Sequence, residues 1–183
     1  MSFINVEIKA RTNNSSAIRN YLLNNGAEFK GLDEQTDTYF NIDNGRLKLR
    51  QGKIENNLIY YNRPDQAGPK QSDFDLLKVE DGDSLRDLLA KAIGIKVVVR
   101  KKREIYNIQN VKFHLDFLDD LGEFVEIEAG NKIHPIETSK LHEQCAYYMR
   151  AFGIEEKDLL NLSYSDMLIN RANEQVLSGK RIT

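Results

Sequence analysis

The sequence predicts an α+β domain in which antiparallel strands are more numerous than helices. Three observations favour this class. Several segments alternate apolar and polar residues with the period of a strand, short runs of turn-forming residues separate them, and other segments place apolar residues at helical spacing. With 183 residues and 40% hydrophobic content, the chain has the size of one globular domain, so we expect a single domain over residues 1–183.

The first half of the chain predicts one strand, one helix and then three further strands. Residues 4–11 alternate apolar and polar side chains, as in a half-buried strand. Asn14 and its neighbours offer helix-capping side chains before an amphipathic helix over residues 17–25, and Gly26 follows as a stop. The three further strands are expected at residues 36–42, 45–51 and 56–63. The short turns between them are typical of antiparallel neighbours.

The second half adds a loop, more strands and several helices. Pro64, Gly68 and Pro69 predict a loop over residues 63–70. A helix is expected over residues 84–93, and the pattern after Pro135 is helical, with Gly153 dividing it into at least two pieces. The remaining strands are expected at residues 72–79, 95–108, 111–118 and 123–130.

The charge balance argues against a general affinity for nucleic acid or for an anionic membrane. The chain has 26 basic and 28 acidic residues and a net charge of -2, so any anion-binding site must be local. Its single cysteine, Cys145, cannot form an intramolecular disulfide, and no apolar run approaches the length of a membrane span. Together with a charged amino-terminal segment in place of an apolar leader, these features predict a cytoplasmic protein.

Charged side chains recur on one face of each predicted strand. Strand periodicity places Glu7 with Lys9, His114 with Asp116, and Glu126 with Glu128. The cations distributed in this way, including one at a strand end and one after the Gly-Pro loop, are Lys9, Arg11, Arg46, Lys48, Arg50, Arg63, Lys70, Lys101 and Arg103.

These charged faces allow two arrangements. If they turn inward around a closed sheet, they would line a cavity with roughly eight cations and about four carboxylates, a composition that requires a strongly anionic ligand. Clustered carboxylates also repel one another unless a hard cation lies between them, so a polyphosphate with Mg²⁺ or Mn²⁺ would satisfy both sets. A sheet with one solvated face would show the same alternation, and periodicity leaves both arrangements open.

The order of the segments resembles the CYTH family, named for class IV adenylyl cyclases and thiamine triphosphatases. The amino-terminal NVEIKAR is similar to the family's Glu-x-Glu-x-Lys strand. The segments that follow in the family's order are QTDTYF, GRLKLR, LIYYNRPDQAGPKQSDF, VVRKKREIY, FHLDFLDDLGEFVEIEA and SYSDML. The resemblance implies an eight-stranded antiparallel closed β-barrel, the triphosphate tunnel, with charged faces inside and flanking α-helices. The Gly-Pro-Lys loop is more similar to the cyclase-like branch than to the thiamine triphosphatases.

The resemblance also implies roles for individual residues. The phosphate-binding residues would be Lys9, Arg46, Lys48, Arg50, Arg63, Lys70, Lys101 and Arg103. The ligands of Mg²⁺ or Mn²⁺ would be Glu7, Asp116, Glu126 and Glu128, and these four with Lys9 would form the catalytic set. The implied reaction is that of an adenylyl cyclase-like lyase, in which the ribose hydroxyl of ATP attacks the α-phosphorus and pyrophosphate leaves.

One departure from the family pattern leaves other functions open. Asn5 occupies the position of the first glutamate of the signature, and the loss of one negative charge should weaken metal binding. The alternatives are an inorganic or organic triphosphatase, a non-catalytic nucleotide- or polyphosphate-binding protein, and an interaction domain with a solvated charged sheet. A nucleoside triphosphate or polyphosphate is the expected partner, and the pattern neither requires nor excludes a homodimer.

Overall fold

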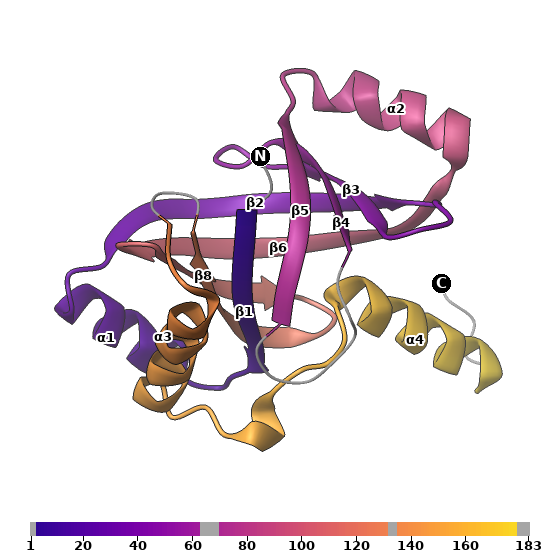
Figure 1. Ribbon diagram of the computed structural model, residues 1–183. Helices are drawn as coiled ribbons and strands as arrows, with labels where there is room; N and C mark the ends of the chain where they lie inside the picture. Colours follow the sequence, from indigo (N-terminus) through magenta and orange to yellow (C-terminus); the bar gives the residue numbers. More distant parts are fainter. Residues whose placement is uncertain (1–2, 63–69, 132–134, 179–183) are drawn as a thin grey trace.

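A computed structural model describes residues 3–62, 70–131 and 135–178, and this part of the chain forms eight β-strands and four α-helices (Figure 1). The strands are β1 (Phe3–Arg11), β2 (Glu28–Phe40), β3 (Arg46–Gln51), β4 (Asn57–Asn62), β5 (Lys70–Lys78), β6 (Ile95–Ile108), β7 (Val111–Leu118) and β8 (Gly122–Gly130). The helices are α1 (Ser15–Asn24), α2 (Gly82–Ile93), α3 (Thr138–Ala151) and α4 (Tyr164–Leu177), and a short 3-10 helix, Glu156–Asp158, precedes α4. The predicted α+β class with predominantly antiparallel strands is confirmed.

The strands pair in an order that returns to its starting point. Among the described strands every pairing is antiparallel, in the order β1-β5-β4-β3-β2-β6-β7-β8. The first part of β1 pairs with β5, and its longer part, from Asn5 to Arg11, pairs with β8. The sheet therefore curls around one interior (Figure 1), and every strand has one face toward that interior and one away from it.

Most element boundaries agree with the sequence pattern, and the clearest difference is at the start of β2. This strand begins at Glu28, well before the expected start at residue 36. Its first three residues are exposed, and a register shift between Phe29 and Gly31 interrupts its pairing with β6. A strand segment exposed on both faces has no alternation to detect, so only its pairing with the long β6 reveals it. Of the predicted loop, residues 63–69 lie outside the described residues.

The main hydrophobic core lies outside the curled sheet. Val6 of β1, Phe113 of β7 and Ile127 of β8 are fully buried on the outer face of the sheet, in one cluster with Leu22 of α1 and Leu141 of α3. Because apolar and charged residues alternate along these strands, an apolar face that packs against the helices requires the charged face to point into the interior. Helix packing on the outside thus determines what lines the inside.

The single cysteine lies at the centre of this outer core. Cys145 of α3 is fully buried, and its thiol donates a hydrogen bond of 3.3 Å to the carbonyl oxygen of Val6. Burial raises the pKa of this thiol to about 12. The side chain therefore behaves as a small apolar group that helps to hold α3 against β1.

The other two helices cover different parts of the sheet. Leu85 and Leu89 of α2 pack against Phe40 and Leu49 on the outer face of β2 and β3. At the start of α4, Tyr164 packs into a cluster that includes the inward-facing Tyr39, Tyr61 and Phe124. None of the helices in the described part of the chain combines the length and apolar character of a membrane span.

Phe113 tests the placement of the core. Its ring centroid lies 4.6 Å from that of Tyr148 and 5.7 Å from that of Phe152, and its side chain is fully buried. Phe113→Ala should therefore lower the free energy of unfolding by about 3–5 kcal/mol, as measured by urea denaturation. The control is Phe29→Ala, in which the ring is 49% exposed and the loss should be at most about 1 kcal/mol. Equal losses for the two variants would contradict an outer core centred on Phe113.

Candidate functional site

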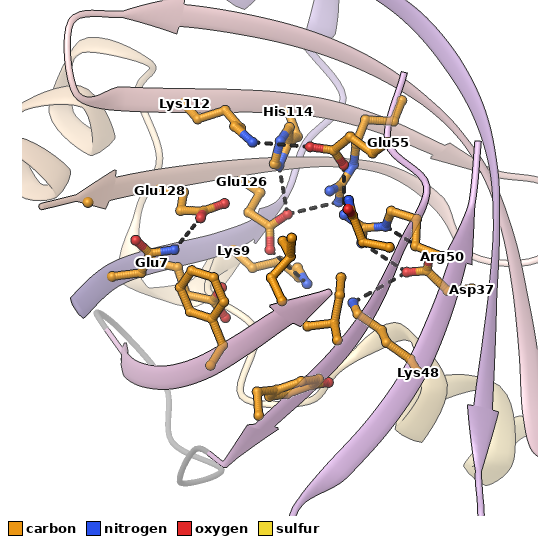
Figure 2. Close-up of a pocket in the computed structure, with 18 of the residues that line it drawn as sticks. Glu7, Lys9, Asp37, Lys48, Arg50, Glu55, Lys112, His114, Glu126 and Glu128 are labelled. Carbon is orange, nitrogen blue, oxygen red and sulfur yellow. Dashed lines mark hydrogen bonds and ion pairs between the residues drawn. The ribbon is translucent and has the colours of Figure 1, made fainter. Parts of the chain in front are cut away.

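The inner face of the sheet encloses a cavity of about 280 Å³ (Figure 2). Among the described side chains that line it, six are cationic and five are carboxylates. The cations are Lys9, Lys48, Arg50, Lys101, Arg103 and Lys112, and the carboxylates are Glu7, Asp37, Glu55, Glu126 and Glu128. The alternative of a solvated charged face is therefore wrong, because the ionic sides of the strands face one another across an enclosed space.

Strand register brings these groups together in opposite-charge pairs. On neighbouring strands, Lys9 of β1 lies directly opposite Glu126 of β8, and Asp37 of β2 lies directly opposite Arg50 of β3. Directly opposite residues project from the same face of a sheet, so each pairing delivers both side chains to the cavity. The site is thus assembled by the alternation within strands and the register between them.

Asp37 is the centre of the first ionic cluster. Arg50 donates two hydrogen bonds of 2.9 Å to its carboxylate, Lys101 lies at 2.8 Å and Lys48 at 3.3 Å. Burial opposes ionisation of Asp37, but Arg50, Lys101 and Lys48 outweigh it and hold its pKa well below the ordinary range. For Lys101, burial and repulsion from neighbouring guanidinium groups outweigh Asp37 and lower the pKa to about 7.

Glu126 is the centre of the second cluster. Its carboxylate lies 3.2 Å from Lys9 Nζ, 2.8 Å from Arg103 and 3.0 Å from His114 Nδ1. Burial opposes its ionisation, but Lys9 and Arg103 hold its pKa well below the ordinary range. Arg103 also forms two 2.6 Å hydrogen bonds with Asp116, which in turn accepts one of 2.8 Å from the Tyr164 hydroxyl. Asp116 is completely buried behind Arg103 and does not itself line the cavity.

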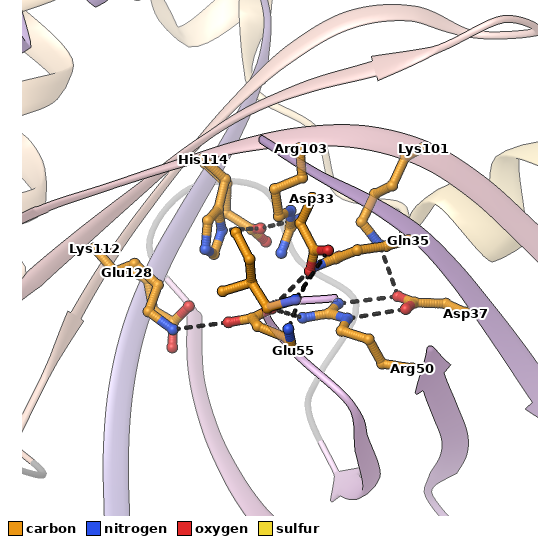
Figure 3. A network of polar contacts seen from close by, with 12 residues as sticks. Asp33, Gln35, Asp37, Arg50, Glu55, Lys101, Arg103, Lys112, His114 and Glu128 are labelled. Carbon is orange, nitrogen blue, oxygen red and sulfur yellow. Dashed lines mark hydrogen bonds and ion pairs between the residues drawn. The ribbon is translucent and has the colours of Figure 1, made fainter. Parts of the chain in front are cut away.

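Glu55 and Asp33 were not predicted from the sequence (Figure 3). Glu55, in the segment between β3 and β4, bonds Arg50 at 2.8 Å and Lys112 at 3.1 Å. Asp33 is fully buried and accepts hydrogen bonds from the backbone N–H groups of residues 53, 54 and 55, which places Glu55 over the cavity. Neither residue lay in a predicted strand, so periodicity gave no signal for them. Lys112 could have been found, because it shares a strand face with His114.

Three of the predicted phosphate-binding residues are not among the described side chains that line the cavity. Arg46 does not line the cavity, and its guanidinium bonds Ser163 and Asp166 at the start of α4, both at 2.9 Å. Arg63 lies outside the described residues. Lys70 begins β5 directly opposite Glu7, but its side chain is also outside the described part of the structure. The role of these three residues stays a prediction.

The predicted metal ligands fit a divalent cation only in part. Glu7 and Glu128 lie directly opposite each other on β1 and β8 and both line the cavity, so a hard cation between their oxygens would offset their repulsion. Asp116 and Glu126, in contrast, have both carboxylate oxygens engaged by cations. Over residues 3–62, 70–131 and 135–178, no group of three or more His, Cys, Asp or Glu side chains is arranged to hold a metal ion. Ligation by all four carboxylates stays a prediction.

Asn5 contacts this carboxylate pair directly. Its side-chain amide donates a hydrogen bond to Glu128 and lines the cavity beside it. A glutamate at this position could not donate such a bond and would add a third negative charge next to Glu7 and Glu128. The asparagine therefore puts a neutral hydrogen-bond donor to Glu128 where a glutamate would add a charge that attracts a cation.

Comparison with known proteins gives a family model and several relatives. The model for the CYTH domain matches residues 4–161. A protein of Methanocaldococcus jannaschii named "Putative adenylate cyclase" is 28% identical over 176 residues, which cover 90% of this chain and 98% of the relative. A solved structure from Pyrococcus horikoshii OT3 has a TM-score of 0.74 and 23% identity, covering 91% of this chain and 98% of that one. Another, from Vibrio parahaemolyticus and named in the same way as the first relative, has a TM-score of 0.71 and 22% identity, covering 90% and 97%.

Asp37 tests the ionic architecture of the site. Asp37→Asn leaves Arg50, Lys101 and Lys48 without their common counter-ion in a buried place, so the free energy of unfolding should fall by about 3–5 kcal/mol in urea denaturation. Asp43→Asn, which changes an exposed aspartate in the turn before β3, is the matched control and should change it by no more than about 0.5 kcal/mol. If Asp37→Asn proved as mild as its control, the three cations would not depend on this carboxylate.

Proposed function

The chain belongs to the CYTH domain family, and on this premise we propose that its cavity binds a triphosphate and that the protein is a metal-dependent, class IV adenylyl cyclase-like enzyme. The reaction would convert ATP into cyclic AMP and pyrophosphate. The observation that carries the proposal is the convergence of six cationic side chains on one enclosed cavity within the described residues. A phosphate chain is the common biological ligand that offers anionic oxygens to several cations at once.

The two ionic clusters suggest how a phosphate chain would be held. Lys9 and Lys48 reach into the same space from opposite clusters (Figure 2), and the contact of Lys48 with Asp37, at 3.3 Å, is longer than those of Arg50 and Lys101. Phosphate oxygens would therefore pair first with the cations whose contacts to carboxylates are longest, such as Lys48. Arg50 and Arg103, each bonded to two carboxylates, would keep their positions and present their remaining N–H groups.

Catalysis would then consist mainly of positioning and electrostatic stabilisation. The lysines and arginines would hold the triphosphate so that the ribose hydroxyl lies in line with the α-phosphorus and would offset the charge that accumulates on the departing pyrophosphate. Glu7 and Glu128 are the side chains that would hold a divalent cation, which when bound supplies a Lewis acid for phosphate oxygens.

One observation favours a second candidate, a protein that binds triphosphates without converting them. The side-chain amide of Asn5 donates a hydrogen bond to the Glu128 carboxylate, and Asn5 itself carries no charge. The cationic part of the cavity is unaffected by this exchange, so phosphate binding would persist while the cation site is weakened. In this case Asn5→Glu should create or increase turnover.

A product-resolved assay tests the proposed function. Purified protein is incubated with ATP, GTP, thiamine triphosphate or tripolyphosphate, each with Mg²⁺ or Mn²⁺, and the products are separated. Cyclic AMP and pyrophosphate from ATP are the expected products, whereas orthophosphate would indicate a triphosphatase. Complete absence of cyclic AMP with both metals and across pH would defeat the cyclase proposal, and binding without any product would favour the second candidate.

Lys48 provides the matched variant for this assay. Lys48→Met removes a cation that lines the cavity, so triphosphate affinity should fall by at least about tenfold in calorimetric titration. Lys96→Met removes an exposed lysine that does not line the cavity and should leave the affinity unchanged. A similar affinity for both variants would place the triphosphate elsewhere.

The lowered pKa of Lys101 leads to a prediction about how triphosphate binding depends on pH. Its pKa of about 7 in the free protein means that it is largely neutral above that pH, whereas phosphate oxygens nearby favour the ammonium form. Binding should therefore take up a proton, and affinity should fall as pH rises from about 7.5 to 9.5, by at most tenfold per pH unit. Calorimetry in buffers of different ionisation enthalpy measures the uptake, and Lys101→Met should abolish it. A pH-independent affinity in this range would show that Lys101 does not change its protonation state on binding.

A further inference from the structure

One wall of the cavity has a chemistry that a phosphate chain does not explain. Among the described side chains, those that β4 and β5 contribute to the lining are all uncharged: Asn57, Ile59, Tyr61, Phe74 and Leu76. Charged residues come from β1, β2, β3, β6, β7 and β8 and from the segment before β4. Among the described side chains, the cavity therefore has a charged side and an uncharged side.

Register makes the uncharged side a continuous surface. Tyr61 of β4 lies directly opposite Phe74 of β5, and Ile59 lies directly opposite Leu76. Two aromatic rings and two branched aliphatic side chains thus form one patch on neighbouring strands. We call these four residues the apolar wall.

Packing within the protein accounts for only part of the apolar wall. Tyr61 is buried, and Ile59 and Phe74 pack against its cluster at the start of α4. Leu76, in contrast, lines the cavity and is still 47% exposed. Apolar surface in contact with water is unfavourable, and a ligand that covers it would recover this free energy. A triphosphate alone offers no group of this kind.

The apolar wall lies next to one of the cations that line the cavity, Lys48. Lys48 of β3 lies directly opposite Ile59 of β4, and its Nζ is 5.5 Å from the ring centroids of both Tyr39 and Tyr61. A phosphate bound to Lys48 would thus lie at the edge of the wall. From there, Ile59 and Leu76 offer the neighbouring apolar surface for a group that the phosphate carries.

We propose that the apolar wall is the binding subsite for a planar, uncharged ring group attached to the triphosphate, such as a nucleobase. The inference rests on the proposed function and extends it, because it selects an organic triphosphate over inorganic tripolyphosphate and orients it in the cavity. Aromatic and branched aliphatic side chains accept a flat ring through stacking and apolar contact. The phosphate chain lies on the charged side, with the phosphate that carries the ring nearest Lys48.

Calorimetric titration of the full chain with ATP and with tripolyphosphate tests the subsite. The wild-type protein should bind ATP at least tenfold more tightly than tripolyphosphate. Leu76→Ala should weaken ATP binding by roughly five- to tenfold and leave tripolyphosphate binding unchanged, because it removes contact with the ring alone. Leu77→Ala is the matched control, since this neighbour on β5 is 63% exposed and does not line the cavity. It should change neither affinity.

Retained tripolyphosphate binding shows that each variant is folded, and Ile59→Ala provides a second variant from the opposite strand. Equal affinity of the wild type for the two ligands, or parallel losses of both in Leu76→Ala, would overturn the subsite and leave the proposed triphosphate binding intact. If neither ligand binds to the wild type, the proposed function fails, and the subsite fails with it.

Discussion

Opposite charges buried inside a curled sheet are the constraint on which the rest of this structure depends. A buried ion without a partner costs several kcal/mol, so each cation in the interior requires a carboxylate close by. Asp37 and Glu126 meet this requirement for five cations between them. Since the inward face of the sheet is ionic, the hydrophobic core has to form on its outer face. There α1, α2 and α3 supply the apolar side chains that cover it.

This internal pairing has a consequence for any anionic ligand. In the described part of the chain, five carboxylates line the cavity beside six cations, so the protein's own carboxylates already neutralise most of this positive charge. A triphosphate therefore has to exchange with existing partners, and its affinity is the difference between two sets of ionic contacts. Such a site favours ligands whose geometry matches several cations at once, and it discriminates against small anions that replace only one partner.

The sequence predicted the periodic parts of this structure well and the non-periodic parts poorly. The bounds of β6 and β7 are those expected, and most charges assigned to common strand faces do line one cavity, as Lys48 and Arg50 show. Periodicity could not show which face points inward, because the alternation is the same on a solvated sheet. The resemblance to a family supplied that information. Glu55 was missed because its position depends on hydrogen bonds in irregular backbone, and Asp33 because it lies in the early part of β2, before the predicted start of this strand. Arg46 bonds Ser163 and Asp166 at the start of α4 and does not itself line the cavity.

The position of Cys145 between α3 and β1 has a practical consequence. The chain contains one cysteine, and its thiol is sealed within the outer core with a raised pKa, so alkylating reagents cannot reach it while α3 is docked. Labelling requires a local or global opening that exposes the thiol, so its rate reports how often such an opening occurs. The protein thus contains a natural reporter of its own local opening, on the opposite face of the sheet from the ionic interior.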